Sequence, residues 1–339
     1  MLYIRVDMNN VIATGHVMRC IAIADAAKRL KVETTFILAD DNAKQLLQNK
    51  GYRTIVLYSN WEQLDGELEI LRNIIAQEGI ESLLVDTYQV TSHYLHVLSK
   101  YVDVYYLDDL NAFEYPVRNI ICYANYWDKM NYSDTVILEG VKVKRNLLLG
   151  CDYAPLRAEF QDMKEKKINK ISNVMILSGG TDNHNIIERF LNSLDKNRFR
   201  NIIAICGRYY DHYDELVKKY ENYKNIKLFQ AVDNLIEYME NSDLVISAGG
   251  TTLYELSAVG TPTISYSFAD NQLDNCKRFH DDGIIAYAGD VRNDNIFENV
   301  NEIINKQYDS LEVRSKRSRM MQRLVDGYGA TRIVEAIIK

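Results

Sequence analysis

Short apolar runs recur along the chain, and most of them are followed by a stretch with the period of an amphipathic helix. Runs of this kind are typical of strands that a parallel sheet buries on both faces. In the first half we predict strands at residues 3–7, 35–38, 54–57, 82–86, 102–107 and 119–122, with helices beginning at 16 and near 41–50, 61–77 and 91–100. This alternation predicts a doubly wound α/β domain.

The pattern loosens beyond residue 109 and resumes at residue 173. Residues 123–150 are predicted to be a tyrosine-rich irregular region, 153–160 look like a short helix, and 161–167 form the most highly charged run. We place an interdomain linker in that run and predict domains at residues 1–160 and 161–339. Strands at 173–177, 202–205, 226–229, 244–246 and 263–266 predict a second doubly wound α/β domain. Helices are predicted at 308–326 and 329–338, and we expect the last one to cross back to the first domain.

Two Rossmann-like domains of this kind are expected to face each other across a cleft, where small-molecule sites preferentially lie. Within the second domain, the strand at 244–246 runs into glycines at 249 and 250, and a helix follows at once. Thr252 and Glu255 have the spacing of a capping box. Because a strand that opens a helix through glycines aims free N–H groups at one point, we interpret this junction as a cradle for a nucleotide diphosphate. The alternative is that the glycines only form a turn and Glu255 only caps the helix.

The composition argues against several classes of protein, among them nucleic-acid-binding, membrane-spanning and disulfide-rich proteins. The net charge of −7 argues against a nucleic-acid surface, because neutralising a phosphate backbone needs an excess of Lys and Arg. No apolar run approaches the roughly 20 residues that span a bilayer, and the first residues lack the apolar core of a signal peptide, so we expect a cytoplasmic protein. The five cysteines are widely spaced and suggest neither disulfides nor a zinc site.

A set of ordered motifs adds a resemblance to a known family. It begins with Gly15-His16-Val17-Met18-Arg19-Cys20 after Arg5-Val6-Asp7, and continues with Leu84-Val85-Asp86-Thr87-Tyr88, Leu107-Asp108-Asp109-Leu110, Tyr153-Ala154-Pro155-Leu156-Arg157, Ser178-Gly179-Gly180-Thr181-Asp182, Ala248-Gly249-Gly250-Thr251-Thr252, Asp270-Asn271-Gln272 and Leu324-Val325-Asp326-Gly327-Tyr328-Gly329-Ala330. In these motifs the chain resembles the UDP-2,4-diacetamido-2,4,6-trideoxy-β-L-altropyranose hydrolases of pseudaminic acid biosynthesis, which have a GT-B fold. It departs from them at Ile12-Ala13-Thr14, where a second glycine is usual, at Ala158, where proline is usual, and at Asn183-His184.

The resemblance implies a hydrolase that cleaves the anomeric C–O bond of a UDP-linked diacetamido-trideoxy sugar with inversion. His16 would be the base that takes a proton from water, because the dipole at the first turn of its helix disfavours the protonated ring. Asp7, at the end of the first strand, would assist it, although a loop-capping role is nearly as well supported. We expect no cofactor, no metal, no membrane insertion and a monomer. The first domain would then bind the sugar and the second UDP.

The same resemblance assigns substrate-binding residues. Glycines and threonines at the helix junction would hold the phosphates, Glu255 the ribose, Gly207 the uracil, and Asn271 with Gln272 the sugar or a phosphate. Arg19 would either hold its loop or approach the diphosphate, and Tyr88 would line the sugar pocket. The full predicted set is Gly15, Arg19, Tyr88, Arg157, Gly180, Thr181, Gly207, Gly249, Gly250, Thr251, Thr252, Glu255, Asn271 and Gln272.

Two other functions remain open. An inverting glycosyltransferase of the same fold would use His16 to activate an acceptor hydroxyl in place of water, and a nucleotide-sugar sensor would keep the cradle without turnover. Asp108 and Asp109 could suggest a metal pair, but adjacent carboxylates after a strand are more often caps, and no third ligand stands at a recognisable spacing.

Overall fold

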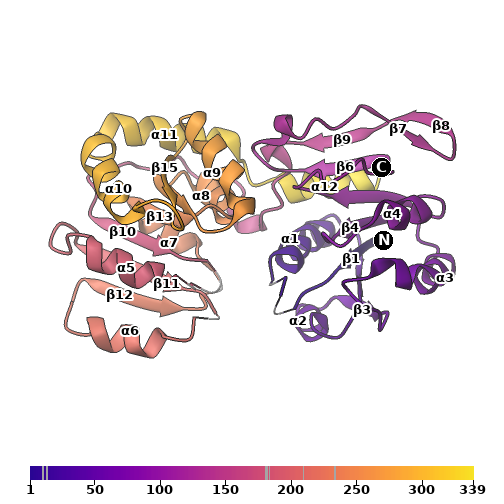
Figure 1. Cartoon of the computed structure of the whole chain (residues 1–339), viewed down its shortest axis with the longest axis horizontal. Helices are drawn as coiled ribbons and strands as arrows, with labels where there is room; N and C mark the ends of the chain where they lie inside the picture. Colours follow the sequence, from indigo (N-terminus) through magenta and orange to yellow (C-terminus); the bar gives the residue numbers. More distant parts are fainter. Residues whose placement is uncertain (10, 13, 180–181, 183, 209, 233) are drawn as a thin grey trace. The chain divides into compact units, whose positions relative to one another are not determined.

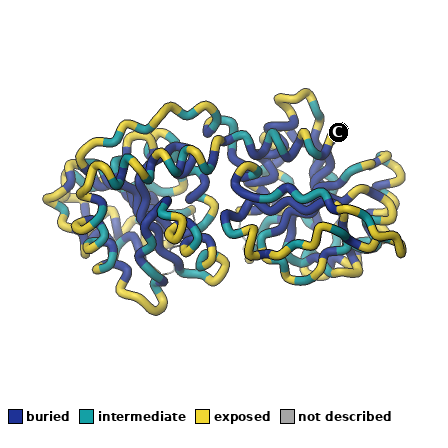
Figure 2. Tube along the Cα trace, turned by 90° about the horizontal axis from the view of Figure 1, so that it is seen from above, coloured by how far each residue is buried: buried dark blue, intermediate teal, exposed yellow. Residues whose placement is uncertain are grey.

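The computed structural model describes residues 1–9, 11, 12, 14–179, 182, 184–208, 210–232 and 234–339. The chain divides into two compact units (Figure 1). Unit 1 comprises Met1–Ala158 together with Gly327–Lys339, and unit 2 comprises Glu159–Asp326. In each unit the strands lie at the buried centre, while exposed residues are concentrated in helices and loops (Figure 2).

Unit 1 is built on a seven-stranded parallel sheet in the order β3-β2-β1-β4-β5-β6-β9. Its strands are β1 (Leu2–Val6), β2 (Thr34–Leu38), β3 (Arg53–Val56), β4 (Ser82–Asp86), β5 (Asp103–Leu107), β6 (Asn119–Cys122) and β9 (Asn146–Leu149). Its helices are α1 (Gly15–Arg29), α2 (Lys44–Asn49), α3 (Leu68–Glu78), α4 (Ser92–Leu98) and α12 (Gly329–Ile337). The alternating pattern of the first half therefore does produce a doubly wound sheet.

The region predicted as irregular, residues 123–150, contains regular structure that the pattern missed. β7 (Thr135–Leu138) and β8 (Val141–Lys144) form an antiparallel hairpin, and β9 adds a strand to the main sheet. Both turn residues of the hairpin, Glu139 and Gly140, have positive φ, as a two-residue type I′ turn requires. Charged side chains alternate with valines in β8, so this strand has no continuous apolar run to reveal it.

The helix predicted at residues 153–160 is wrong. The segment forms two short 3-10 turns, Cys151–Tyr153 and Ala158–Phe160, separated by extended backbone. Pro155 explains the break, because proline disfavours helical backbone in the residue that precedes it, here Ala154.

Unit 2 is built on a six-stranded parallel sheet in the order β12-β11-β10-β13-β14-β15. Its strands are β10 (Asn173–Leu177), β11 (Asn201–Cys206), β12 (Ile226–Gln230), β13 (Leu244–Ala248), β14 (Thr263–Ser267) and β15 (Ala286–Asp290). Its helices are α5 (Ile186–Ser193), α6 (Tyr213–Tyr220), α7 (Ile236–Asn241), α8 (Thr252–Val259), α9 (Asp270–Asp281), α10 (Ile296–Ile303) and α11 (Leu311–Leu324). β15 is a strand that the apolar pattern did not predict, since it is short and ends in Gly289 and Asp290.

Both sheets contain a point where the strand order reverses. In unit 1 the chain runs outward from β1 through β2 to β3 and then returns to β4 on the other side of β1. In unit 2 the same reversal occurs between β10 and β13. Open α/β sheets bind ligands beyond the carboxyl ends of the strands at such a switch point. The loops after β1, β4, β10 and β13 are therefore the places to examine for a site.

The last helix, α12, belongs to unit 1 although it follows unit 2 in sequence (Figure 1). It packs against α1, and the Tyr105 hydroxyl of β5 donates a hydrogen bond to the Ala336 carbonyl at 2.9 Å. A Cβ added to Gly329 would lie 2.2 Å from the Ala154 carbonyl oxygen, so the start of α12 fits only as glycine. The end of the chain is thus built into the core of unit 1.

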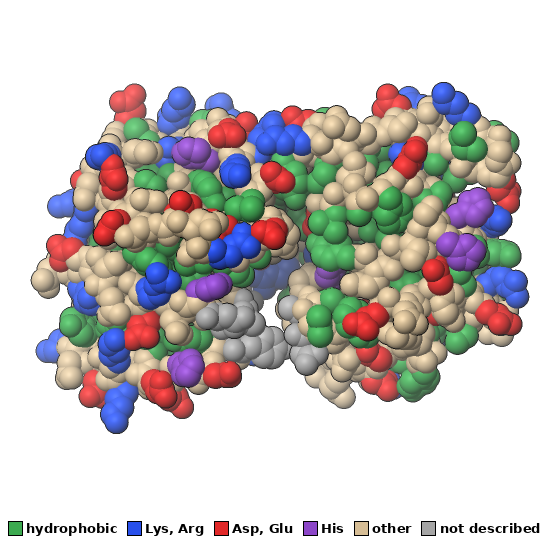
Figure 3. All heavy atoms as spheres, in the orientation of Figure 1, with side chains coloured by type: hydrophobic (Ala, Val, Ile, Leu, Met, Phe, Trp, Pro, Cys, Tyr) green, Lys and Arg blue, Asp and Glu red, His purple; other side chains and the backbone are tan. Residues whose placement is uncertain are grey.

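Charged side chains of both signs are interspersed over the visible face of each unit, with no extended basic patch (Figure 3). Within the described residues, no helix has the length and apolar character needed to cross a membrane.

Candidate functional site

The switch point of unit 1 brings a histidine and an aspartate together. His16 is the second residue of α1, and Asp86 is the last residue of β4, which pairs in parallel with β1. The His16 Nδ1 atom lies 2.6 Å from Asp86 Oδ1, and both side chains are buried. Arg19 Nη2 lies 3.0 Å from the same Nδ1 atom. In the tautomer whose Nδ1–H donates to the Asp86 carboxylate, Nε2 keeps its lone pair. No hydrogen bond to Nε2 from the described residues competes for it.

Arg19 holds Asp86 in place from one turn further along α1. Its Nε atom donates to Asp86 Oδ2 at 2.7 Å, Nη2 donates to Asp86 Oδ1, and Nη1 donates to the Tyr123 hydroxyl at 2.9 Å. Burial alone would raise the pKa of Asp86, but Arg19 and His16 more than offset this and hold that pKa well below its usual value. Of the two roles predicted for Arg19, the contacts favour holding the site together over approaching a diphosphate.

Tyr88 forms one wall beside His16. The two rings meet edge to face with centroids 4.6 Å apart, and the Tyr88 hydroxyl donates to Asp109 Oδ2 at 3.1 Å. Burial, followed by the nearby Asp109 carboxylate, raises the pKa of Tyr88, so the phenol stays protonated. The structure thus brings Tyr88 and Arg19 to the same site as His16.

Asp7 is engaged elsewhere. Its Oδ2 accepts from Arg5 Nη1 at 2.6 Å, and its Oδ1 accepts from the Ala39 amide at 2.7 Å. Arg5 is fully buried and also donates twice to Glu67, at 2.7 and 2.9 Å. Both oxygens of Asp7 therefore have partners in a buried ionic network. Of the two predicted catalytic residues, His16 is the one that retains an open proton-accepting atom.

The two neighbouring aspartates after β5, Asp108 and Asp109, contact different groups. Asp108 is buried and accepts from the backbone amides of Leu110 and Asn111 at 3.1 and 2.9 Å and from the Tyr115 hydroxyl at 2.8 Å. These contacts fit the capping role expected for it. Asp109 instead turns toward Arg19, whose Nη1 lies 3.3 Å from Asp109 Oδ2.

In unit 2, two glycines lie between β13 and α8, and Gly249 and Gly250 have different roles. The Gly249 amide donates to the Tyr266 carbonyl at 2.9 Å, and a Cβ at Gly249 would lie only 2.1 Å from Cys276 Sγ on α9. Gly249 is therefore required for packing. A Cβ at Gly250 would meet no atom within 4 Å. In the described part of the chain, no backbone carbonyl accepts from the amides of Gly250 and Thr251, which leaves them available to an anion.

The predicted capping box does not form. Thr252 is the first helical residue, Thr251 occupies the N-cap, and the Thr251 side chain makes no capping hydrogen bond. Thr251 has helical backbone angles, whereas a capping side chain needs an N-cap residue in the extended region. Glu255 lies one turn into α8 and is half-buried. The ribose contact of Glu255 stays a prediction.

The remaining predicted residues are scattered over both units. Gly15 begins α1, half-buried Arg157 precedes a 3-10 turn, and Gly207 follows β11. Asn271 is exposed in the first turn of α9, and Gln272 Oε1 accepts from the Phe268 amide at 3.1 Å. Gly180 and Thr181 lie outside the described residues.

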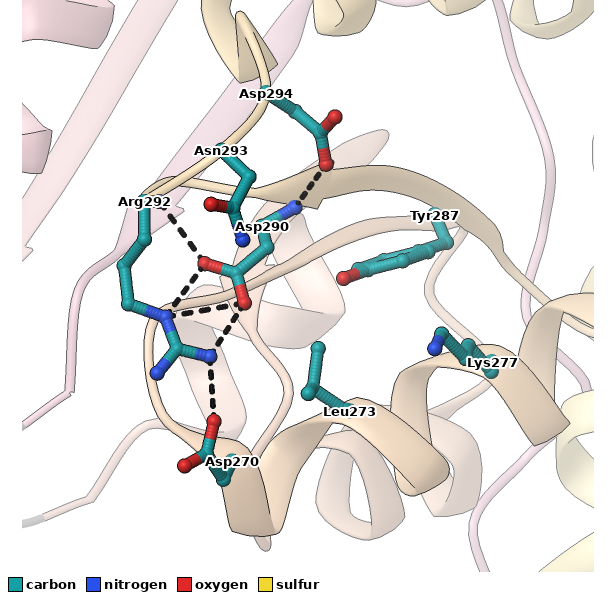
Figure 4. A pocket seen from close by; sticks show the side chains of 8 residues that line it. All are labelled: Asp270, Leu273, Lys277, Tyr287, Asp290, Arg292, Asn293 and Asp294. Carbon is teal, nitrogen blue, oxygen red and sulfur yellow. Dashed lines mark hydrogen bonds and ion pairs between the residues drawn. The ribbon is translucent and has the colours of Figure 1, made fainter.

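A pocket of about 510 Å³ opens beside the start of α9 (Figure 4). Arg292 lies between two carboxylates there, with Nη2 2.7 Å from Asp270 Oδ1 and 2.6 Å from Asp290 Oδ2. The other residues that line the pocket are Leu273, Lys277, Tyr287, Asn293 and Asp294. The pocket borders the segment 270–272, but Asn271 and Gln272 do not line it.

Two residues of the unit 1 site were missed from the sequence, Asp86 and Asp109. Each follows a run of apolar residues, so each was visible as a carboxylate at the end of a predicted strand. The missing information was the strand order, which puts β4 and β5 on the same side of β1 and brings both carboxylates to Arg19.

Comparison with solved structures identifies the architecture. The chain superposes on MurG of Acinetobacter baumannii with a TM-score of 0.71 and 12% identity, over 99% of this chain and 98% of that one. The chain has the GT-B fold. The GT-B likeness extends to the spinosyn rhamnosyltransferase SpnG, solved with thymidine diphosphate, at a TM-score of 0.63 and 13% identity over 99% of this chain and all of that one.

A family model matches unit 2, and the sequence relatives cover more of the chain. Residues 173–326 match the model of the glycosyltransferase family 28 C-terminal domain. The spore coat polysaccharide biosynthesis protein SpsG of Bacillus subtilis (strain 168) is 24% identical over 81% of this chain and 79% of its own length. An uncharacterized protein of Methanocaldococcus jannaschii, MJ1062, is 25% identical over 74% of this chain, which spans about half, 52%, of that relative.

Proposed function

We propose that the chain cleaves the anomeric C–O bond of a nucleotide-sugar donor and transfers the glycosyl group to an oxygen nucleophile, with His16 as the base. The observation that carries the proposal is the His16 ring, with Nδ1 bound to Asp86 at 2.6 Å and Nε2 open. The match of residues 173–326 to a glycosyltransferase domain and the open amides after β13 support a donor that ends in a nucleoside diphosphate.

The proposed reaction transfers one proton to His16, forms one C–O bond and breaks another. Nε2 of His16 takes the proton of the nucleophile, whose oxygen forms a bond to the anomeric carbon as the C–O bond to the diphosphate breaks. Asp86 stabilises the imidazolium that results, in the same way that a buried carboxylate supports a catalytic histidine elsewhere. The amides of Gly250 and Thr251 and the dipole of α8 stabilise the negative charge of the departing diphosphate. Attack opposite the leaving group inverts the anomeric configuration.

The nucleophile is either an acceptor hydroxyl or water. Transferases prevail among the similar proteins, including the UDP-N-acetylglucosamine transferase of Bacillus cytotoxicus that is 26% identical over 68% of this chain and 60% of its own length. This favours a hydroxyl acceptor and UDP as the nucleotide. The Gly15-to-Cys20 motif and the ordered motifs that resemble UDP-diacetamido-trideoxy-altrose hydrolases favour water. In both cases His16 has the same task.

A single assay separates these functions. The protein is incubated with a panel of UDP-sugars, first alone and then with sugar and lipid-linked acceptors, and UDP release is measured. Release without an acceptor supports hydrolysis, release only with an acceptor supports transfer, and binding without any release contradicts both. When hydrolysis occurs in heavy-oxygen water, the label should enter the free sugar. Label in UDP would mean attack on phosphorus and would refute His16 as the base for attack on carbon.

A further inference from the structure

One polar atom near His16 is left without a partner. Among the described residues, Asp109 Oδ1 is a buried carboxylate oxygen to which nothing hydrogen-bonds. Buried polar groups in folded proteins are almost always paired, and an ionised acceptor is especially costly to leave unpaired. Oδ1 itself is enclosed. The Asp109 side chain as a whole is 19% exposed, so the carboxylate lies at the edge of the buried group.

The other oxygen of Asp109 is fixed, which fixes the direction of the open one. Oδ2 accepts from the Tyr88 hydroxyl at 3.1 Å and from Arg19 Nη1 at 3.3 Å. Both contacts come from the same group of side chains as His16, since Tyr88 packs against the His16 ring and Arg19 binds Asp86. The residues that line the proposed reaction site of unit 1 therefore hold the Asp109 carboxylate through Oδ2 and set the position of Oδ1.

We propose that Asp109 Oδ1 recognises the substrate by accepting a hydrogen bond from a hydroxyl or amide N–H group of the transferred sugar. This inference rests on the proposed function. A carboxylate can accept but not donate, so it favours a sugar that presents a donor at this position. It disfavours a sugar that presents a carboxylate there, because two negative charges would meet in a partly buried site. Asp109 would thus select among nucleotide sugars, while His16 performs the proton transfer.

The substitution Asp109→Asn tests this role cleanly. Arg19 and Tyr88 both donate to Oδ2, so the amide oxygen of asparagine must face them, and its NH₂ group must take the place of the open oxygen. The variant keeps the contacts that hold the site and replaces the acceptor with a donor. Asp103→Asn, at the exposed start of β5, the strand that Asp109 follows, provides the matched control.

The experiment measures the binding of UDP, UDP-glucose, UDP-N-acetylglucosamine and UDP-glucuronic acid to the full chain by calorimetry. For the neutral UDP-sugar that the wild-type protein binds best, Asp109→Asn should weaken binding by roughly 10- to 100-fold, the range for a hydrogen bond to a charged group. UDP affinity and the unfolding temperature should match those of Asp103→Asn. The wild-type preference for neutral sugars over UDP-glucuronic acid should shrink in Asp109→Asn, a change that a purely structural role would not produce.

The outcomes are distinguishable. If Asp109→Asn binds UDP and every UDP-sugar like the wild type, or if the wild type binds UDP-sugars no differently from UDP, the role of Asp109 is refuted while the nucleotide cradle stands. If the wild-type protein binds neither UDP nor any UDP-sugar, the proposed function fails and this inference fails with it.

Discussion

His16 is the residue on which the proposed chemistry depends, and its substitution has a defined outcome. His16→Asn should lower turnover by about 10²–10⁴-fold, the usual contribution of a positioned general base. UDP affinity should change little, because the proposed cradle lies in unit 2. Steady-state kinetics and calorimetry test the two parts. His93→Asn, on α4, is the control. A variant at His16 that keeps more than roughly a tenth of the wild-type rate, with chemistry limiting, would remove His16 as the base.

Asp86 should matter for both stability and activity. Asp86→Asn leaves Arg19 without its buried counter-charge, and breaking a buried ion pair typically costs about 3–5 kcal/mol. The pKa of Asp86 is lowered in the folded state, so its stabilising effect is present above the unfolded-state value of about 3.9 and is lost as pH falls below it. Urea unfolding should show a large deficit for the variant at pH 7 that narrows below about pH 4. An equal deficit at both pH values would contradict this account.

The sequence predicted three members of this side-chain group, His16, Arg19 and Tyr88, and missed two others. His16 was identified because it stands in a Gly-His-x-x-Arg motif at the start of a helix. Asp86 was quoted only as part of a motif, and Asp109 was weighed only as a metal ligand or a cap, since their importance depends on which strands are neighbours. Asp7 was chosen because it ends the first strand. Its two oxygens accept hydrogen bonds from Arg5 and from the Ala39 amide. Ala39 follows β2, whereas Asp7 follows β1, so this contact depends on the pairing of the two strands.

At the scale of elements, alanine substitutions of the two glycines after β13 should have different effects on stability. Gly249→Ala should destabilise the protein by about 1–3 kcal/mol, because its Cβ would overlap Cys276 Sγ and push α9 away. Gly250→Ala should leave stability nearly unchanged, since nothing lies within 4 Å of the added carbon. Thermal unfolding of the two variants compares them directly. Equal unfolding temperatures would mean that α9 does not pack on this loop as described.

Elements with continuous apolar runs were predicted well, and elements without them were missed. Most strands from β1 to β6 and from β10 to β14 are buried on both faces, so their sequence pattern is strong. The edge strands β3 and β12 are only partly buried, but their apolar runs are still continuous enough to be recognised. β8 carries Lys142 and Lys144, and β15 contains a glycine with φ of 113°, which no apolar pattern can reveal. The failed capping box shows a related limit, because the spacing of Thr252 and Glu255 does not report the backbone angles of Thr251.

For the molecule as a whole, the five cysteines should react only slowly with thiol reagents in the native state. All are buried and in no disulfide. Burial raises the pKa of Cys122, Cys206 and Cys276 to about 12 and that of Cys20 well above its usual value. Because the thiolate is the reactive form, a disulfide reagent at pH 8 should label the native protein very slowly. It should label five thiols per chain in denaturant. Rapid labelling of a native thiol would show that its unit opens readily.

The position of α12 has a consequence for the order in which the chain is made. Unit 2 is continuous from Glu159 to Asp326, whereas unit 1 needs residues from both sides of it. As the polypeptide leaves the ribosome, the first 158 residues emerge without the helix that covers α1, and they must wait while all of unit 2 is synthesised. Unit 2 can therefore finish folding first, although it is translated second. During that interval the apolar surface of α1 that α12 will cover is exposed, so the nascent first unit is prone to aggregate until α12 emerges.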